Sequence, residues 1–358
     1  MKISNRKMTR QIKLGSVSIG AGTPVVVQSM TKTDTRDTAS TVAQIHRLQE
    51  AGCEAVRVAV VDMDAAIAIE KIKQGISIPL IADIHFDHKL ALEAIRRGVD
   101  GLRINPGNIG SEEKIRAVVS SAKDRGIPIR IGVNAGSLEK KLLKKYGHPT
   151  VEAIVESAAW HIELLEKLNF NEIKVSLKAS DVLRTVEAYR LFSERFTYPL
   201  HIGISEAGPS FTGTIKSSVG LGILLYEGIG DTMRVSLTAD PVEEVRVAYE
   251  ILKSLGLRER GPVLVSCPTC GRCQVNIQSL AAQVESHLQN LKKNITVAVM
   301  GCPVNGPGEA KEADVGIAGG KGIGIVFRKG QVIKTINENQ LLDALLEEIA
   351  LFEGEEKN

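Results

Sequence analysis

The stretch LIADIHFDHKLALEAIRRGVDGLRI, residues 80–104, contains the unit from which most of this chain is built. Two short apolar segments, Leu80–Asp83 and Gly101–Ile104, have the length and composition of β-strands. Between them, Lys89–Arg97 has the apolar spacing of a helix. The stretch therefore predicts a strand, a polar strand end and a helix, followed by the strand of the next unit.

The same unit recurs from about Pro24 to Leu255. Eight strand–helix units over roughly 230 residues favour an α/β fold of the (β/α)8 TIM-barrel type over an open doubly wound sheet. No Gly-X-Gly-X-X-Gly motif opens a helix after the first strand, which argues against a dinucleotide-binding fold. The predicted strands are Val25–Gln28, Ala55–Val60, Leu80–Asp83, Gly101–Ile104, Ile129–Val133, Ile173–Leu177, Leu200–Ile204 and Thr232–Ser236.

Helices are predicted after these strands, for example over Thr38–Glu50, Val151–Lys167 and Pro241–Leu255. The last of them begins at a favourable pair, because Asp240 can cap the helix and proline suits its first turn. Before the first strand, Gln11–Val25 has Gly-rich turns. We expect this segment to form a hairpin across the N-terminal mouth of the barrel.

The pattern changes after Leu255, at the charged and turn-rich segment 257–262. We therefore predict two domains, a barrel over residues 1–257 and a small α+β domain over residues 258–358. The second domain should contain helices near 278–291 and 340–352. Its predicted strands are Val263–Ser266, Thr296–Val299, one near Val315, and Ile323–Arg328.

Composition narrows the classes of function. A formal net charge of +3 and an aromatic content of 4% are too low for a nucleic-acid-binding surface. No apolar run approaches the roughly 20 residues that cross a bilayer, and the polar start of the chain lacks the apolar core of a signal peptide. We expect a soluble, cytoplasmic protein.

Polar and mostly basic residues mark the ends of the predicted barrel strands, where the active sites of such barrels lie. Cations inside apolar strands need a counter-charge, so they predict a substrate that carries phosphate or diphosphate. A structural ion pair at Arg57 and a core role for His85 remain open, as does a salt bridge from Glu206 instead of a role as proton donor. The residues are Arg57, Asp83, His85, Arg103, Asn105, Arg130, Asn134, Lys178, Glu206, Arg234 and Ser236.

Four of the five cysteines lie in two loops of the second domain, in Cys267-Pro-Thr-Cys270-Gly-Arg-Cys273 and in Gly301-Cys302-Pro-Val-Asn-Gly-Pro-Gly-Glu309. This spacing predicts a metal or cluster site rather than disulfides. Spacing alone leaves open whether Cys273 or Glu309 is the fourth ligand. The fifth cysteine, Cys53, is predicted to be a buried packing residue.

These motifs together resemble the family of 4-hydroxy-3-methylbut-2-enyl diphosphate synthases, the iron-sulfur enzymes of the methylerythritol phosphate isoprenoid pathway, in its two-domain bacterial form. The resemblance runs from about Thr23 to Phe352 and includes residues 27–31 (VQSMT), 103–108 (RINPGN) and 130–137 (RIGVNAGS). It implies an oxidoreductase and homodimer with a [4Fe-4S] cluster held by Cys267, Cys270, Cys302 and Glu309. It also implies ferredoxin or flavodoxin as the electron donor.

The reaction implied by this resemblance is the reductive ring opening and dehydration of 2-C-methyl-D-erythritol 2,4-cyclodiphosphate. Glu206 is then expected to protonate the departing hydroxyl, Glu309 to take part at the cluster, and Asn305 to position the substrate. A zinc-stabilised barrel enzyme with four thiolate ligands and a protein that only relays electrons are the alternatives. The residues expected to bind the cyclodiphosphate are Arg57, Arg103, Arg130, Asn134, Lys178, Arg234 and Ser236.

Overall fold

The computed structural model describes residues 6–289, 291–302, 308 and 310–352 of the chain. The chain divides into two compact units, residues 1–258 and residues 259–358, each with a hydrophobic core of its own. No helix in the described part of either unit is both long enough and apolar enough to cross a membrane.

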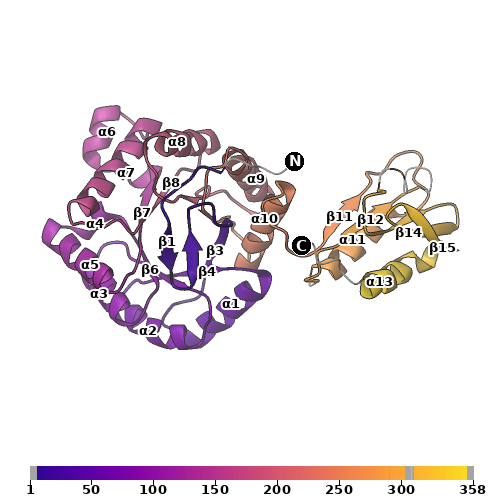
Figure 1. Ribbon diagram of the computed structural model, residues 1–358, viewed down its shortest axis with the longest axis horizontal. Helices are drawn as coiled ribbons and strands as arrows, with labels where there is room; N and C mark the ends of the chain where they lie inside the picture. Colours follow the sequence, from indigo (N-terminus) through magenta and orange to yellow (C-terminus); the bar gives the residue numbers. More distant parts are fainter. Residues whose placement is uncertain (1–5, 290, 303–307, 309, 353–358) are drawn as a thin grey trace. The chain divides into compact units, whose positions relative to one another are not determined.

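The first unit is a closed barrel of eight parallel strands (Figure 1). Their hydrogen-bonded order is β8-β7-β6-β5-β4-β3-β10-β9, and a bridge between Val175 and Leu200 joins the two ends. All eight predicted strands are confirmed, although the last two are shorter than predicted. The strands are β3 (Val26–Met30), β4 (Ala55–Ala59), β5 (Leu80–Asp83), β6 (Gly101–Ile104), β7 (Ile129–Asn134), β8 (Ile173–Lys178), β9 (His201–Ile202) and β10 (Thr232–Met233).

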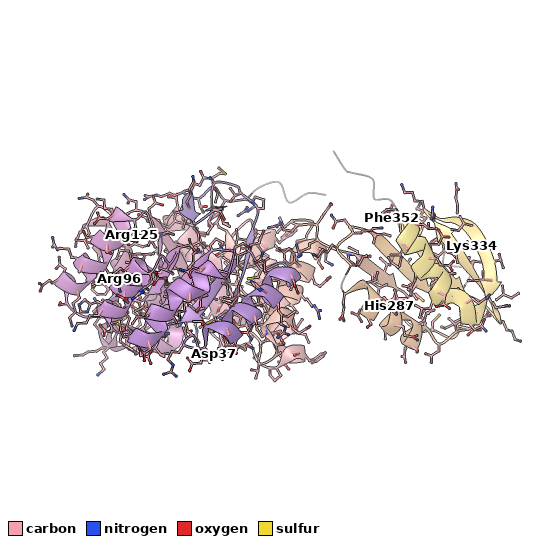
Figure 2. The ribbon with its side chains drawn as sticks, turned by 90° about the horizontal axis from the view of Figure 1, so that it is seen from below. Asp37, Arg96, Arg125, His287, Lys334 and Phe352 are labelled. Carbon is pink, nitrogen blue, oxygen red and sulfur yellow. The ribbon has the colours of Figure 1, made fainter. Side chains whose placement is uncertain are left out.

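Helices surround the strands and bury their apolar sides against them (Figure 1). Aspartate side chains cap several of these helices; Asp240, for example, accepts a hydrogen bond from the backbone N–H of Val242, as predicted. Arg96 and Arg125 lie on the outer, exposed surface (Figure 2). The helices are α1 (Thr38–Ala51), α2 (Met63–Gln74), α3 (His88–Arg96), α4 (Pro106–Ile109), α5 (Glu112–Asp124), α6 (Lys140–Tyr146), α7 (Val151–Glu166), α8 (Val182–Arg195), α9 (Ser210–Tyr226) and α10 (Pro241–Ser254).

The predicted N-terminal hairpin is confirmed as β1 (Ile12–Leu14) paired with β2 (Val17–Ile19). Its apolar side chains pack against Val26, Ala55 and Ile81, which lie at or near the starts of three barrel strands. At Gly101 a Cβ atom would lie only 2.5 Å from Leu14, so glycine is needed for the hairpin to sit this close. The hairpin therefore closes the N-terminal end of the barrel and leaves the C-terminal end for a site.

The second unit is an α+β fold with one five-stranded sheet. Strands β11 (Val263–Ser266), β12 (Thr296–Met300) and β13 (Val315–Gly319) are parallel, and β14 (Ile323–Arg328) and β15 (Gln331–Asn337) continue the sheet in antiparallel fashion. Helices α11 (Ile277–Leu288) and α13 (Leu341–Leu351) pack against it. Strand β15 was not predicted, because it is mostly exposed and shows no alternation of apolar and polar residues.

Candidate functional site

Six basic side chains project into the barrel from four of its strands and from the residue that follows β10. Neighbouring strands place them side by side, since Arg103 is the register partner of Arg130, and Arg130 is that of Lys174. The charges of Arg57, Arg103 and Arg234 also act on Lys178 from other strands. We call the set the barrel cation cluster; it consists of Arg57, Arg103, Arg130, Lys174, Lys178 and Arg234.

Asp83, at the end of β5, is shared by two members of this cluster. Its Oδ1 accepts a hydrogen bond from Nη1 of Arg103 at 3.1 Å, and its Oδ2 lies 3.6 Å from Nε of Arg57. Burial alone would raise the pKa of Asp83, but Arg57, His85 and Arg103 lower it well below its usual range. The carboxylate is therefore ionised at neutral pH and offsets one of the positive charges.

A second carboxylate, Glu244, reaches the cluster from the first turn of α10. Its Oε2 accepts hydrogen bonds from Nε and Nη2 of Arg234, both at 3.2 Å, and its Oε1 accepts one from the backbone N–H of Leu237. Glu244 was not predicted from the sequence, because it lies in a helix and not at a strand end. The predicted helix start at Pro241 places Glu244 in the first turn of α10 and could have indicated this residue.

Met30 separates two of the arginines. Its Sδ lies 2.9 Å from Nη2 of Arg57 and 3.5 Å from Nη1 of Arg234. A thioether is a weak acceptor, so neither guanidinium is fully satisfied by this contact. Both groups keep hydrogen-bonding capacity for a stronger acceptor.

Arg130 and Lys174 are the least satisfied members of the cluster. Both are almost completely buried, and Nε and Nη1 of Arg130 and Nζ of Lys174 have no hydrogen-bond partner among the described residues. Burial and then the charge of Arg130 lower the pKa of Lys174 to about 7, whereas a guanidinium remains charged in proteins. A buried charge without a partner is costly, so this part of the barrel suits an anionic ligand.

Lys178, the last residue of β8, contacts a histidine that was not predicted. Its Nζ lies 3.4 Å from Nε2 of His201, which is completely buried on β9. Both His201 and Lys174 lie on the inner face of their strands. Lys174 could have been predicted from the sequence, because it alternates along β8 with Ser176 and Lys178 on the same face. His201 was missed because candidates were sought at strand ends, whereas His201 lies at the start of the predicted strand Leu200–Ile204.

The two cysteine loops leave the same edge of the second sheet, since Cys267 follows β11 and Cys302 follows β12, and these strands are parallel neighbours. The backbone N–H of Gly301 donates to Sγ of Cys267 at 3.0 Å. A Cβ atom at Gly301 would lie 3.4 Å from that sulfur and 2.6 Å from Sγ of Cys273. Glycine therefore allows both sulfur atoms to lie against the backbone next to Cys302.

All cysteines are free thiols, and Cys270 is exposed. A backbone hydrogen bond from Arg272, followed by one from its side chain, lowers the pKa of Cys270 and so favours the thiolate that binds metals. Within the described ranges no three His, Cys, Asp or Glu side chains are close enough to hold one metal ion. Thiolate donors gathered at one sheet edge nevertheless fit an iron-sulfur cluster, whose iron atoms favour soft ligands.

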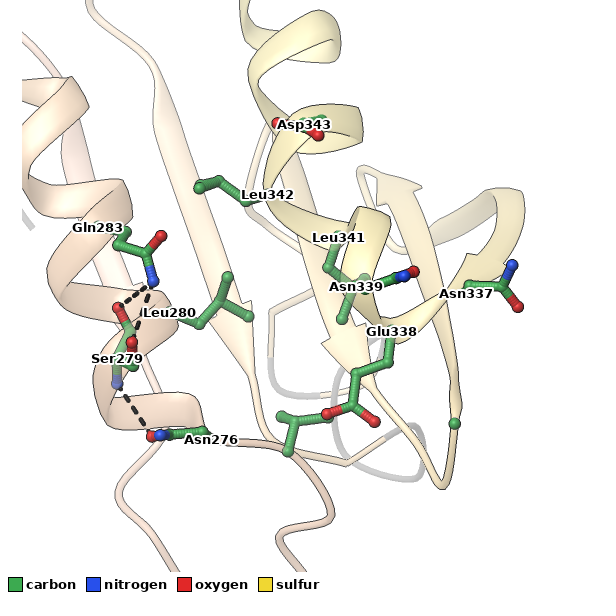
Figure 3. Close-up of a pocket in the computed structure, with 12 residues that line it drawn as sticks. Asn276, Ser279, Leu280, Gln283, Asn337, Glu338, Asn339, Leu341, Leu342 and Asp343 are labelled. Carbon is green, nitrogen blue, oxygen red and sulfur yellow. Dashed lines mark hydrogen bonds between the residues drawn. The ribbon is translucent and has the colours of Figure 1, made fainter.

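A groove of about 650 Å³ in the second unit lies between α11 and the start of α13 (Figure 3). Asn276, Ser279 and Gln283 line its α11 side, and Glu338 and Asp343 line the other. Among the described residues, no lysine, arginine or histidine lines the groove. It is therefore unsuited to a diphosphate, in contrast to the barrel interior.

Comparison with known proteins assigns the family. Residues 9–249 match the model of the GcpE TIM-barrel domain, and residues 263–351 match that of the GcpE protein C-terminal domain. The chain belongs to the GcpE family. The resemblance stated from the sequence and the predicted fold class are thereby confirmed.

Relatives in the GcpE family are similar to this chain over almost its whole length. A 4-hydroxy-3-methylbut-2-en-1-yl diphosphate synthase (flavodoxin) of Thermodesulfovibrio yellowstonii is 66% identical over 344 residues, 96% of this chain and 99% of the relative. One of Geobacter sulfurreducens is 61% identical, covering 95% and 97%. These relatives do not favour the zinc-stabilised alternative.

Among solved structures, a dihydropteroate synthase of Yersinia pestis is similar with a TM-score of 0.50 and 12% sequence identity, covering 69% of this chain and 98% of that protein. At this identity the likeness concerns the fold alone. It agrees with the barrel of the first unit.

Several predicted site residues of this GcpE-family chain lie beside the barrel cation cluster. Asn134 ends β7 as the register partner of Lys178, and Ser236 is half-buried two residues beyond Arg234. His85 is exposed, with Nε2 3.7 Å from Asp83, so a core role for it is wrong. Asn105 is buried and caps the short helix α4.

Glu206 differs from the prediction. Its apolar neighbours in the sequence predict partial burial, but the side chain of Glu206 is exposed, and its backbone has a φ of 52°. The physical reason is that the chain turns sharply here, between β9 and α9, and this turn directs the residue outward. A salt bridge from Glu206 to Lys178 or Arg234 was the open alternative, and Arg234 pairs instead with Glu244.

Two predicted residues of the second cysteine loop, Asn305 and Glu309, lie outside the described residues. Cys53 is buried, as predicted, and burial raises the pKa of its thiol to about 12.

Proposed function

We propose that this chain catalyses the reductive ring opening and dehydration of 2-C-methyl-D-erythritol 2,4-cyclodiphosphate to 4-hydroxy-3-methylbut-2-enyl diphosphate. The observation that carries the proposal is the barrel cation cluster, in which buried guanidinium groups such as that of Arg130 lack acceptors. The names of the GcpE-family relatives support the same reaction. A doubly phosphorylated ring supplies the missing acceptors and negative charge.

The diphosphate binds in the barrel to Arg57, Arg103, Arg130, Lys178 and Arg234. Guanidinium groups offer several N–H donors in a fixed plane and match phosphate oxygens better than an ammonium does. Asp83 and Glu244 hold three of these groups in place before substrate arrives. Asn134 and Ser236 add uncharged hydrogen bonds at the C-terminal end of the barrel, so that the ring is fixed in one orientation.

The second unit holds a [4Fe-4S] cluster through Cys267, Cys270, Cys302 and Glu309. When bound, this cluster would pass the two electrons of the reaction from an external donor to the substrate, one at a time. Cys273 is not a ligand in this proposal, although its sulfur lies close to the backbone of Gly301. Asn305, between Cys302 and Glu309 in the sequence, positions the substrate.

Glu206 donates the proton with which the hydroxyl group leaves as water. Its exposed position at the end of the barrel gives it access to solvent protons. We further propose a cytoplasmic homodimer in which the cluster unit of one copy serves the barrel of the other, with flavodoxin as the electron donor. The names of the relatives support flavodoxin over ferredoxin.

Anaerobic iron and sulfide analysis combined with a turnover assay tests cofactor and substrate together. We expect about four iron and four sulfide per chain and formation of the linear diphosphate with a chemical reductant. Zinc in place of iron, or no turnover by the cluster-loaded protein, would contradict the proposal.

Variants of two arginines separate the enzyme from a protein that only relays electrons. Arg130→Met should lower kcat/KM by about 100-fold or more, because a charge-assisted contact to substrate is lost. Arg125→Met, on the exposed surface after α5, is the matched control and should retain activity. Equal activity of the two variants would refute a role of the barrel cation cluster in substrate binding.

A further inference from the structure

His201 is a buried histidine that the proposed reaction does not use. It lies on β9 inside the barrel and contacts a side chain at each ring nitrogen: Nε2 is 3.4 Å from Nζ of Lys178, and Nδ1 is 2.8 Å from Oγ1 of Thr232. Its carbonyl oxygen accepts a hydrogen bond from the hydroxyl of Tyr189 at 2.6 Å. Lys178, His201 and Thr232 thus form a continuous string across β8, β9 and β10.

The surroundings decide which ring nitrogen carries the proton. Burial, followed by the charges of Arg130 and Lys178, lowers the pKa of His201 well below its ordinary value, so the ring is neutral. With the diphosphate bound, the Lys178 side chain is an ammonium group, which can only donate hydrogen bonds. Nε2 of His201 is therefore the acceptor for Lys178, and Nδ1–H donates to the hydroxyl of Thr232.

The backbone that follows β9 borders the lysine from a second side. A Cβ atom at Gly203 would lie 2.4 Å from Nζ of Lys178 and 2.7 Å from the carbonyl oxygen of Arg234. The lysine side chain thus runs across Gly203 and ends at His201. His201, through its ring nitrogen, and Gly203, through its close-lying backbone, therefore restrict the position of the Lys178 Nζ atom.

We propose that His201 is a positioning residue that fixes the Lys178 ammonium inside the barrel in the orientation in which it meets the diphosphate of the substrate. Thr232 supports this role by fixing the tautomer of His201. The inference rests on the proposed function, since it takes Lys178 as a ligand of that substrate. His201 itself acts through Lys178 and does not touch the reacting atoms.

The test is a double-mutant cycle on the cluster-loaded enzyme, with kcat and KM for the cyclodiphosphate measured separately. His201→Leu should lower kcat/KM by about 10- to 100-fold, mostly through KM, because a hydrogen bond to a charged group is lost. His201→Gln keeps an acceptor near the Nε2 position and should restore activity to within a few-fold. Thr232→Val, an isosteric change outside the lysine contact, should give an intermediate loss.

The cycle then separates positioning from a merely structural role. With Lys178→Met already present, His201→Leu should cost less than about 3-fold, because the interaction that it removes is absent. Losses that multiply in the double variant would overturn the proposal, as would failure of His201→Gln to recover activity in a folded enzyme. Full activity of Lys178→Met alone would instead overturn its place in the proposed substrate site, and this inference with it.

Discussion

Replacing Lys174 by methionine should stabilise the barrel at neutral pH, although it removes a side chain from the candidate site. Methionine is unbranched and similar in length, so it can occupy the same space without a charge. Nζ of Lys174 is buried and has no hydrogen-bond partner among the described residues, so the substitution leaves no acceptor unpaired there. The expected gain is the cost that the buried amine imposes on the folded state.

The magnitude follows from the pKa. Burial, then Arg130, lowers the pKa of Lys174 from 10.5 to about 7, so between these values the unfolded chain binds more protons than the folded one. The cost to the folded state is largest below pH 7 and disappears as the pH rises toward 10.5. With 1.36 kcal/mol for each pKa unit, it amounts to about 4 kcal/mol at pH 7 and about 1 kcal/mol at pH 10.

Urea unfolding at pH 7 and pH 10 measures this difference. Trp160, the only tryptophan, lies on α7, so its fluorescence reports the barrel unit. The stability advantage of Lys174→Met over the wild type should shrink by about 3 kcal/mol from pH 7 to pH 10. The apolar gain from methionine is equal at both pH values and cancels in this comparison.

Lys123→Met, on the exposed side of α5, is the matched control and should change stability by less than about 0.5 kcal/mol at either pH. An advantage of Lys174→Met that is the same at pH 7 and pH 10 would refute the reasoning. Such a result would mean that Lys174 keeps its proton on folding.

Three further predictions concern other residues. Asp83→Asn should lower the free energy of unfolding in urea by about 3 kcal/mol and kcat/KM by about 100-fold, because Arg103 loses its buried ionic partner. A variant with wild-type stability would contradict this. Gly301→Ala should reduce the iron content after anaerobic reconstitution, since its Cβ would lie 2.6 Å from Sγ of Cys273. The control variant Gly271→Ala has open space around its Cβ and should retain the iron content. Cys273→Ser should keep both iron and activity, and an iron-free product would make Cys273 a ligand in place of Glu309.

Much of the fold could be predicted from the sequence because the barrel repeats one local pattern. Each strand is a short apolar segment with a polar end, and each is followed by a helix with apolar spacing, so eight repetitions identify the closed sheet. Strand β15 escaped because exposure on both faces removes the alternation that identifies a strand. The turn that joins β14 to β15 was the remaining local indication of a further strand, because Lys329 and Gly330 both have positive φ there.

The candidate site was predicted less completely, for two physical reasons. Strand ends reveal residues such as Arg103 and Arg130 because a charge in an apolar strand is conspicuous. The side chains that pair with these basic residues do not lie at strand ends. Glu244 contacts Arg234 from a helix, and His201 contacts Lys178 from the start of β9. Long-range pairings of this kind depend on the closed barrel and not on local sequence.

The barrel cation cluster also explains why arginines and lysines are combined in one site. Asp83 and Glu244 pair with three of its six basic side chains, and the charge of Asp231 acts on Lys174, so these carboxylates are too few to neutralise the cluster. Guanidinium groups stay charged under these conditions and provide constant attraction for phosphate. The two lysines respond differently, because burial lowers the pKa of both and allows each to lose its proton while the barrel is empty. A polyanion that enters the barrel reverses this effect, so the site gains positive charge when its ligand supplies the opposite charge, and the empty barrel avoids part of the cost of self-repulsion.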